Sequence, residues 1–529
     1  MKRNLKSFSA IIGALAMLFM SVIIVFAETE EIMPIDITAN TIITDKNFDV
    51  TDSSAFNISA GDAVMKNIAV KMKSASYTQD KLPEEAVIIP AISAKGGNVF
   101  IQSSGISTNC AFSAGISAEG NAKIYLENSD VTAQATSSNG VISKNGALFY
   151  AWNSTFNAKD SDSFIFKITE NAGNTVLDGC KLATEQPESH AVYTENLFVA
   201  NDSSVSGIYP DIIGIAGGKV NLYNTSLDGS LVGEATENYI VSLSNKLNGT
   251  GTSEFYMDGG KLTAYNTGIF SLYGNDNKIH ISNTEIVSGD DCPYLLMFNQ
   301  TGEKTACNLT VNASEIKDNV IMAEDNTLDF YLLDASKFSG RFLDKIAVNE
   351  EKATEQETEI TKEADTEEVK EESKTEEAEK TNARFYNVNM FIGFDSVWTV
   401  NESVKINKLV NCNAIVDSEG NPVKVIDKNG KVLEEGESEI TVTVNEYTKG
   451  GEAEKFEGSL FGEEYGIYKL AKPEKLNYEP ATETTTREKI PEEVKETLFK
   501  YKNYVAIAGG VLVALIITVI IVKSNKKKK

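Results

Sequence analysis

A short unit that recurs along the middle of the chain constrains its fold more than any other feature. In each copy an alternating apolar strand runs into Asn or Asp, a small residue follows, and a second short strand begins, as in residues 124–131 and 148–156. Successive corners are 22 to 29 residues apart, with one gap of 34, and they stand at Asn128, Asn153, Asp178, Asn201, Asn224, Asp258, Asn283, Asn312 and Asp334. A period of this length is typical of solenoids, in which each repeat buries its apolar side against its neighbours.

Each unit holds two or three strands of four or five residues, which are too short for independent sheets. If the units stack, each strand pairs with the strands above and below it at about 4.8 Å. The alternating Ile, Val, Leu and Phe residues then fill a continuous core, and Asn side chains at the corner are expected to hydrogen-bond along the stack. The pattern therefore predicts an all-β fold, a right-handed parallel β-helix solenoid. A β-sandwich is the rival fold, because it also shows short strands with turn signals.

The pattern resembles that of the pectin-lyase-like superfamily and of bacterial adhesin passengers, over roughly residues 97–343. The resemblance implies a surface protein of adhesin-like or carbohydrate-active type. Residues 97–348 are assigned to the β-helix coils. Residues 28–96 are expected to form irregular first coils and an N-terminal cap, which must cover an open sheet edge.

Composition divides the rest of the chain. The segment 349–382 is rich in Glu and Lys without an aromatic residue, which predicts an acidic low-complexity insertion between coils. Coils resume over residues 383–470, where the alternating run 439–444 is expected to close the stack. Residues 471–503 are polar and contain three prolines, as in a stalk that spaces a domain from a membrane.

Both ends of the chain indicate export and membrane anchoring. Residues 1–27 combine basic residues, an apolar run and a small residue at the boundary, which predicts a secretory signal peptide, with an uncleaved anchor as the alternative. The uncharged run 504–522 is long enough, at about 28 Å as a helix, to cross a bilayer. The lysine-rich tail 523–529 is then cytoplasmic. No Leu-Pro-x-Thr-Gly-like sorting motif precedes the run, so we expect a single-pass protein of the cell membrane with an extracellular ectodomain, most simply on a Gram-positive bacterium.

The formal net charge of −27 argues against binding to nucleic acid or anionic lipid. The five cysteines are scattered and odd in number, which is unlike a disulfide scaffold, and they are interpreted as small buried side chains. A Cys292–Cys307 bridge stays open. No metal-ligand spacing is visible, so no cofactor or metal is expected.

One motif carries possible chemistry. Residues 288–292, Ser-Gly-Asp-Asp-Cys, are similar to a coil of polygalacturonases, inverting hydrolases that need an acid and a base carboxylate. The similarity implies Asp290 and Asp291 as catalytic residues. Gly268 stands where the family has a further carboxylate, however, and the family's Gly-His-Gly and Arg-x-Lys elements are missing. Pectate lyases use calcium and a basic residue, and Arg is scarce in these coils.

The two histidines show no neighbouring residues typical of a triad or metal site; His190 is expected in a loop and His280 on the outer side of a strand. Six tyrosines could form a stripe along the stack that suits sugar rings, although core positions are the alternative for many of them: Tyr193, Tyr209, Tyr223, Tyr256, Tyr265 and Tyr273. We therefore expect a non-catalytic surface β-helix that binds cell-wall glycan or a host or neighbouring-cell ligand. A polysaccharide-degrading enzyme is the alternative, and a scaffold for other wall proteins is a third class.

Overall fold

The computed structural model describes residues 34–74, 88–232, 238–246, 251–289, 291–299, 304–323, 325–345, 384–450 and 471–477. Nearly all of the regular structure in these ranges is β-strand. The column and the chain up to Leu476 belong to one compact unit. The predicted signal peptide, acidic insertion, membrane-spanning segment and basic tail lie outside the described residues.

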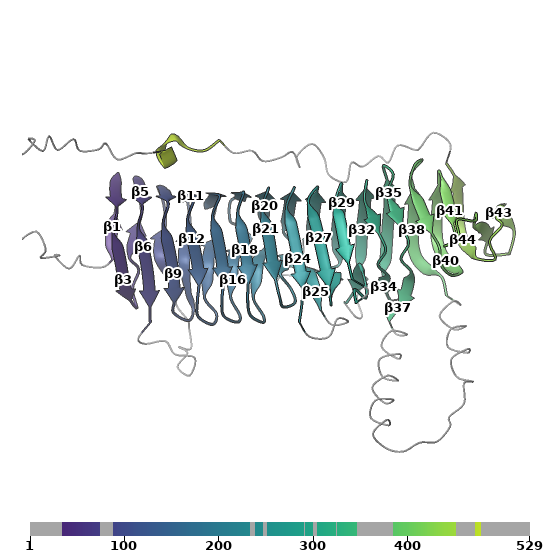
Figure 1. Cartoon of the computed structure of the whole chain (residues 1–529), viewed down its shortest axis with the longest axis horizontal. Helices are drawn as coiled ribbons and strands as arrows, with labels where there is room; N and C mark the ends of the chain where they lie inside the picture. The colour runs from purple at the N-terminus through teal and green to yellow at the C-terminus, as the bar shows by residue number, and fades with distance from the viewer. Residues whose placement is uncertain are drawn as a thin grey trace, which may run out of the picture. The chain divides into compact units, whose positions relative to one another are not determined.

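The strands stack into three long faces, each made by one strand from every coil (Figure 1). Sheet A consists of β1 (Ile35–Ile37), β4 (Phe56–Ile58), β7 (Ile89–Ala94), β10 (Ser113–Ala118), β13 (Asn139–Ser143), β16 (Phe164–Ile168), β19 (His190–Thr194), β22 (Ile213–Ala216), β25 (Tyr239–Ser244), β28 (Gly268–Leu272), β31 (Leu296–Phe298), β34 (Val320–Met322) and β37 (Phe342–Asp344). Sheet B contains β2 (Thr41–Thr44), β5 (Asp62–Lys66), β8 (Asn98–Gln102), β11 (Lys123–Glu127), β14 (Leu148–Trp152), β17 (Thr175–Asp178), β20 (Leu197–Asn201), β23 (Lys219–Tyr223), β26 (Ser253–Asp258), β29 (Asp276–Ser282), β32 (Ala306–Asn312), β35 (Thr327–Leu333), β38 (Tyr386–Ile392), β40 (Val404–Asn411), β44 (Thr441–Lys449), β42 (Lys424–Asp427) and β43 (Val432–Glu434).

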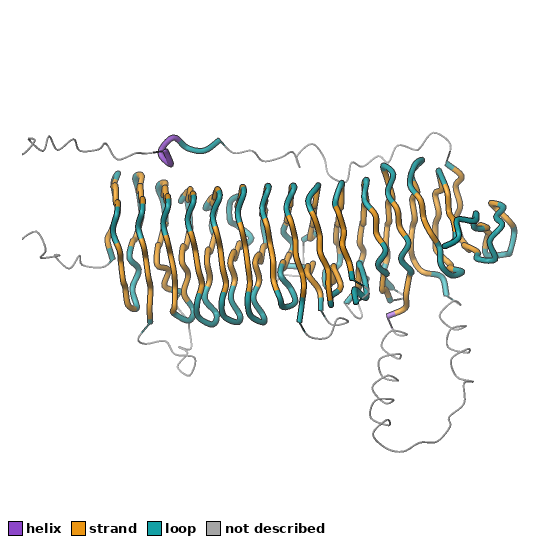
Figure 2. The backbone as a smooth tube through the Cα atoms, viewed as in Figure 1, coloured by secondary structure: helices purple, strands orange, loops and turns teal. Residues whose placement is uncertain are grey.

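The third face is sheet C, which a short sheet D continues. Sheet C contains β3 (Asn47–Thr51), β6 (Ala69–Lys73), β9 (Gly105–Asn109), β12 (Asp130–Ala133), β15 (Thr155–Ala158), β18 (Lys181–Thr184), β21 (Ser204–Gly207), β24 (Ser226–Ser230), β27 (Lys261–Tyr265) and β30 (Glu285–Ser288), and sheet D contains β33 (Glu315–Ile316), β36 (Lys337–Phe338), β39 (Val397–Thr399) and β41 (Ala414–Val416). Strand and turn alternate regularly along the chain (Figure 2).

Every strand pair between successive coils is parallel, as in β11 with β14 and β14 with β17. The one antiparallel strand pair, β42 with β43, lies at the C-terminal end, where β42 also pairs with β44. The described chain is therefore an all-β stack of parallel sheets. This architecture is consistent with the predicted solenoid and unlike a sandwich of antiparallel sheets.

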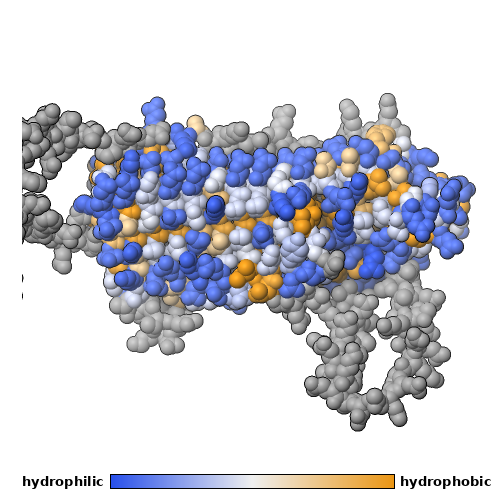
Figure 3. All heavy atoms as spheres, viewed as in Figure 1, coloured by the Kyte–Doolittle hydropathy of each residue, from blue (hydrophilic) through white to orange (hydrophobic). Residues whose placement is uncertain are grey.

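The core is one continuous cluster of apolar side chains that runs the length of the column. It is rich in aromatic residues that pack edge to face or tilted, such as Phe149, Phe156 and Phe166, all of which are fully shielded from solvent. The face in view in Figure 3 is mainly hydrophilic, with a narrow apolar band along its length. The strand alternation that the sequence shows thus separates inside from outside.

The corner between sheets B and C departs in detail from the prediction. A residue with left-handed backbone occupies it in the coils from β2 to β36, and this residue is Asn at Asn128, Asn153 and Asn224. In other coils it is the residue after the predicted one, as with Gly179 in place of Asp178 and Gly259 in place of Asp258. Asn and Gly tolerate positive φ best, which suits Asn128 and Gly179. At two corners, however, Asp202 and Ala313 take the left-handed backbone although an Asn precedes each of them, so the path of the coil also decides which residue adopts it.

A ladder of hydroxyl groups, rather than of Asn side chains, carries most of the hydrogen bonding at this corner. The residue after the left-handed one is Ser or Thr in most coils, and its side chain is buried. The amide of Ser104 donates to Ser129 Oγ at 3.1 Å, and the amide of Ser129 donates to Ser154 Oγ at 3.2 Å. Each hydroxyl also donates to a carbonyl two residues earlier, as Ser129 does to Glu127 at 2.7 Å. The prediction of an Asn ladder holds only locally, as between Asn283 and Asp258.

Replacing Ser129 by Ala is expected to lower the free energy of unfolding by about 1 to 3 kcal/mol. The substitution leaves the buried amide of Ser104 without its acceptor, and such a group loses its full solvation. The readout is the midpoint of urea unfolding of the full chain. Ser107→Ala, on the outer side of β9, is the matched control and should shift the midpoint little. Equal shifts in the two variants would refute a special role for the ladder.

Candidate functional site

The outer face of sheet A carries the most concentrated group of aromatic and polar side chains that could meet a ligand. Its strands share a local pattern in which two adjacent apolar residues enter the core, as Ala191 and Val192 do in β19. Two adjacent inward residues interrupt the alternation of the strand, so the residues on either side of the pair face the same way. The residues on either side, His190 and Tyr193, therefore both face outward.

The same pattern recurs in neighbouring coils and builds two outward rows. One row contains Phe164, His190 and Tyr239, and Asp211 precedes β22 at the corresponding place. The other runs through Tyr193, Gly214 and Ser242. We call the following residues the sheet A strip: Phe164, His190, Tyr193, Asp211, Gly214, Tyr239, Ser242 and Tyr273.

His190, Asp211 and Ser242 form a hydrogen-bonded group across three coils. His190 Nδ1 lies 2.6 Å from the Asp211 carbonyl oxygen and 3.6 Å from Asp211 Oδ2. Ser242 Oγ donates to Asp211 Oδ1 at 2.6 Å. Burial raises the pKa of the Asp211 carboxyl, while His190 and Ser242 oppose that rise.

The order of these three groups does not match a nucleophilic triad. In a triad the imidazole must contact the hydroxyl so that it can accept its proton. Here the carboxylate lies between the hydroxyl and the imidazole. The arrangement positions polar groups and favours ligand binding over acyl transfer.

Aromatic rings surround this polar group. The rings of Phe164 and His190 stack at 5.0 Å with an interplanar angle of 11°, and Tyr193 packs against both. Tyr239 and Tyr273 meet edge to face at 6.1 Å. Aromatic faces provide flat apolar area, and their neighbours here supply hydrogen-bond donors and acceptors.

Gly214 allows these groups to approach one another closely. A Cβ at this position would lie 3.1 Å from the Tyr193 ring, 3.5 Å from His190 Nδ1 and 3.6 Å from Ser242 Oγ. The absence of a side chain therefore lets an aromatic ring, an imidazole and a hydroxyl group converge on one position of the strip. A ligand with apolar faces and hydroxyl edges matches such a surface.

The strip continues toward the C-terminal coils through amide and amine groups. Asn299 Nδ2 lies 3.2 Å from the Tyr273 hydroxyl, and Lys345 Nζ donates to Asn299 Oδ1 at 3.2 Å. The polar and aromatic surface therefore extends along several coils, as a polymeric ligand would require.

The six predicted tyrosines do not form a single stripe. Tyr193 and Tyr273 lie on the sheet A side, Tyr223 and Tyr256 on sheet B, Tyr265 at the end of β27 in sheet C, and Tyr209 in the turn before β22. Three residues of the sheet A strip were not predicted from the sequence: Tyr239, Asp211 and Ser242. The repeated pair of apolar residues flanked by polar or aromatic ones, at the coil period, was the available signal.

The prediction for His190 was wrong, because it opens strand β19 rather than lying in a loop. Its partner Asp211 lies 21 residues further along the chain, which is too far for a local sequence motif to contain both residues. His280 faces outward from β29, as expected, and its ring lies 4.8 Å from that of Tyr256.

Of the predicted carboxylate pair, Asp290 lies outside the described residues. Asp291 is exposed in the turn after β30, where the Cys292 amide donates to the Gly289 carbonyl at 3.0 Å. The nearest counterpart one coil further on is Asp318, whose carboxyl is buried, and burial raises its pKa. A hydrolase role for Asp290 and Asp291 stays a prediction.

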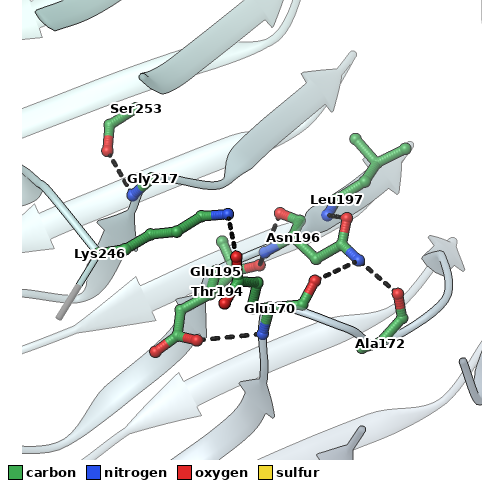
Figure 4. Close-up of polar contacts among 9 residues, drawn as sticks. All are labelled: Glu170, Ala172, Thr194, Glu195, Asn196, Leu197, Gly217, Lys246 and Ser253. Atoms are coloured by element: carbon green, nitrogen blue, oxygen red, sulfur yellow. Dashed lines mark hydrogen bonds and ion pairs between the residues drawn. The ribbon is translucent and has the colours of Figure 1, made fainter. Parts of the chain in front are cut away.

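A second polar network lies at the corner between sheets A and B (Figure 4). Lys246 Nζ reaches Glu170 Oε1 at 2.9 Å, and the lysine stem passes over Gly217, where a Cβ would lie 3.1 Å from Lys246 Cε. The Glu170 amide donates to Glu195 Oε2 at 3.0 Å, and Asn196 Nδ2 donates to the Glu170 and Ala172 carbonyl oxygens. Its members bond to each other across coils, so the network stabilises the corner.

All five cysteines are free in the structure, Cys292 and Cys307 included, and four of them are buried. Burial raises the pKa of the Cys180 thiol to about 11, which keeps it protonated at neutral pH. Within the described ranges, no three His, Cys, Asp or Glu residues are grouped as ligands for a metal ion.

Comparisons with known protein families, with curated proteins and with solved structures returned no match. In the part of the chain that the structure describes, no helix has both the length and the apolar character that crossing a membrane requires.

Proposed function

We propose that this protein is a non-catalytic surface β-helix that binds glycan chains along the sheet A strip. Export by residues 1–27 and anchoring by residues 504–522 complete the proposal and place the column outside the cell. The observation that carries it is the strip itself, in which aromatic rings and hydrogen-bonding groups lie side by side around Gly214.

The chemistry of the strip matches that of a sugar polymer. A pyranose ring presents apolar C–H faces that pack on aromatic rings and hydroxyl groups that hydrogen-bond at its edge. Successive coils repeat these groups at about 4.8 Å, so a polymer can engage several of them together. The net charge of −27 disfavours polyuronic acids and favours uncharged or amino-sugar polymers.

The finer fold assignment belongs to the same proposal. Crossover connections between parallel strands are right-handed in nearly all proteins, which supports a right-handed column. Stacked parallel coils with a left-handed corner residue support the resemblance to pectin-lyase-like surface proteins.

The Tyr193→Ala variant of the full chain is expected to bind its glycan about 5- to 30-fold more weakly than the wild type. Loss of one ring that packs on a sugar removes about 1 to 2 kcal/mol of binding free energy. The measurement is a glycan array followed by titration calorimetry with the best-bound polymer. Tyr265→Ala removes a 42% exposed ring on another face and is the matched control.

The outcomes separate the competing functions. Weaker binding in Tyr193→Ala with unchanged binding in Tyr265→Ala supports the proposal. Equal binding by all three proteins contradicts the sheet A site. Release of reducing or unsaturated sugars that Asp290→Asn abolishes would overturn the non-catalytic assignment in favour of a polysaccharide-degrading enzyme.

A further inference from the structure

The outer face of sheet B carries a continuous central row of mostly apolar and aromatic side chains. The row is in register from strand to strand, and its rings stack, with Phe100 and Tyr125 at 5.0 Å and Tyr125 and Tyr150 at 5.5 Å. It continues through Val176 and Val199. We call the following residues the sheet B row: Phe100, Tyr125, Tyr150, Val176, Val199, Asn221 and Tyr256.

The middle of this row is shielded from solvent although it faces away from the core. Val176 is 3% exposed, Val199 0% and Asn221 1%. Val176 and Val199 form an apolar cluster with Tyr223, separate from the main core. Neighbouring strands of sheet B cover only the sides of these outward side chains and leave their ends accessible to solvent. The burial of the row therefore requires a segment that covers it.

Asn221 points to the kind of partner. Both polar atoms of its amide are buried, and neither has a hydrogen-bond partner among the described residues. A buried amide without partners is costly. An extended peptide laid over the row offers both N–H and C=O groups at this depth.

A segment of this chain already contacts the N-terminal end of sheet B. Lys472 pairs with Glu127, and Lys475 pairs with Asp62 and lies 5.6 Å from the centroid of the Phe100 ring. Leu476, in the short helix η2 (Glu474–Asn477), is fully buried. The Glu127 side chain is only 7% exposed, so its pairing with Lys472 offsets a real desolvation cost.

The length of the intervening chain restricts its path. The Gly450 amide donates to the Asn411 carbonyl at 2.9 Å, which places residue 450 at the far end of sheet B. From β44 to β11 the pairings step through eleven strand intervals, or about 53 Å at 4.8 Å each. The 22 residue steps from Gly450 to Lys472 span about 75 Å when extended and about 33 Å as an α-helix. Only a largely extended path bridges the two ends, and both ends lie on sheet B.

The composition of this stretch fits a packed segment better than a solvated linker. Residues 451–470, which lie outside the described residues, contain seven large apolar or aromatic residues: Phe456, Leu460, Phe461, Tyr465, Ile467, Tyr468 and Leu470. We propose that residues 451–470 are the partner of the sheet B row and run along it from the last coil to the docked segment 471–476.

Photo-crosslinking tests the partner directly. A benzoylphenylalanine placed at Tyr150 or Tyr256 in the full-length protein should crosslink within one chain to peptides from residues 451–470, identified by mass spectrometry. The same probe at Thr132, on the outer side of β12 in sheet C, is the control and should not reach that segment. Crosslinks from the row to a second copy, to other segments or to none would overturn the proposal.

A charge exchange tests the docked end independently. In the full chain, Lys472→Glu with Lys475→Glu should speed tryptic cleavage after Lys469 at least tenfold, because both ion pairs become repulsive. Restoring opposite charges with Glu127→Lys and Asp62→Lys should recover slow cleavage. Exchanging the exposed pair Lys317 and Glu315 is the matched control. Fast cleavage after Lys469 in the wild type would contradict the proposal.

Discussion

The Gly260→Ala variant is expected to lose about 2 to 5 kcal/mol of stability. Gly260 has φ +78°, and a Cβ there would lie 2.7 Å from the Thr225 amide nitrogen and closer still to the Thr225 carbonyl oxygen. Left-handed backbone costs a residue with a Cβ about 1 to 2 kcal/mol. A clash with the backbone of the adjacent coil adds about 1 to 3 kcal/mol. The shift in the urea midpoint of the full chain is the measurement.

Gly420→Ala isolates the second contribution. Gly420 has a similar φ of +85°, but no atom lies within 4 Å of the position its Cβ would take. This variant should lose only the backbone contribution, about 1 to 2 kcal/mol. The difference between the two variants therefore measures the close approach of neighbouring coils at this corner. Equal losses would show that the coils do not approach so closely.

Acid is expected to destabilise the protein through His280. Burial lowers the pKa of His280 to about 4, although the nearby Asp258 opposes this. In the unfolded chain the imidazole has a pKa near 6.5, so the unfolded state binds the proton more readily. Above about pH 6.5 the imidazole is neutral in the folded and the unfolded state, so His280 does not lower the free energy of unfolding there. Stability falls by about 3 kcal/mol as the pH drops from about 6.5 to about 4.

The His280→Gln variant, which does not titrate in this range, tests this assignment. The stability of the wild type relative to the variant should decline between pH 6.5 and 4 and remain constant above pH 7. Thermal unfolding of both proteins across this pH series is the measurement. Parallel curves would mean that the acid sensitivity arises elsewhere.

The repeat in the sequence was sufficient to predict the fold of the described residues. Alternation with period two separates core from surface in each short strand, and the recurrence of the corner forces successive strands into the same register. The position of the corner was predicted to within one residue, because either of two adjacent residues, such as Asp178 or Gly179, can take up the positive φ found there. Propensity alone does not distinguish them, whereas the fit of the whole coil does.

The candidate site was less predictable. His190, Asp211 and Ser242 come together only because their separations of 21 and 31 residues correspond to whole turns of the column. Small differences in coil length would move each side chain to another corner. Ala191 and Val192 both enter the core, so His190 and Tyr193 both face outward, which strict alternation would not predict.

By itself, then, the sequence determined the periodic stack, its apolar core and the spacing of its corners, since these depend on local backbone preference and on burial at a fixed spacing. Only the tertiary structure decided which side chains share a face. It assembled the sheet A strip from separate coils, replaced the expected Asn ladder with buried hydroxyl groups and docked Lys472 against Glu127, 345 residues earlier in the chain. Contacts between coils depend on the exact length of every intervening turn, which no single repeat encodes.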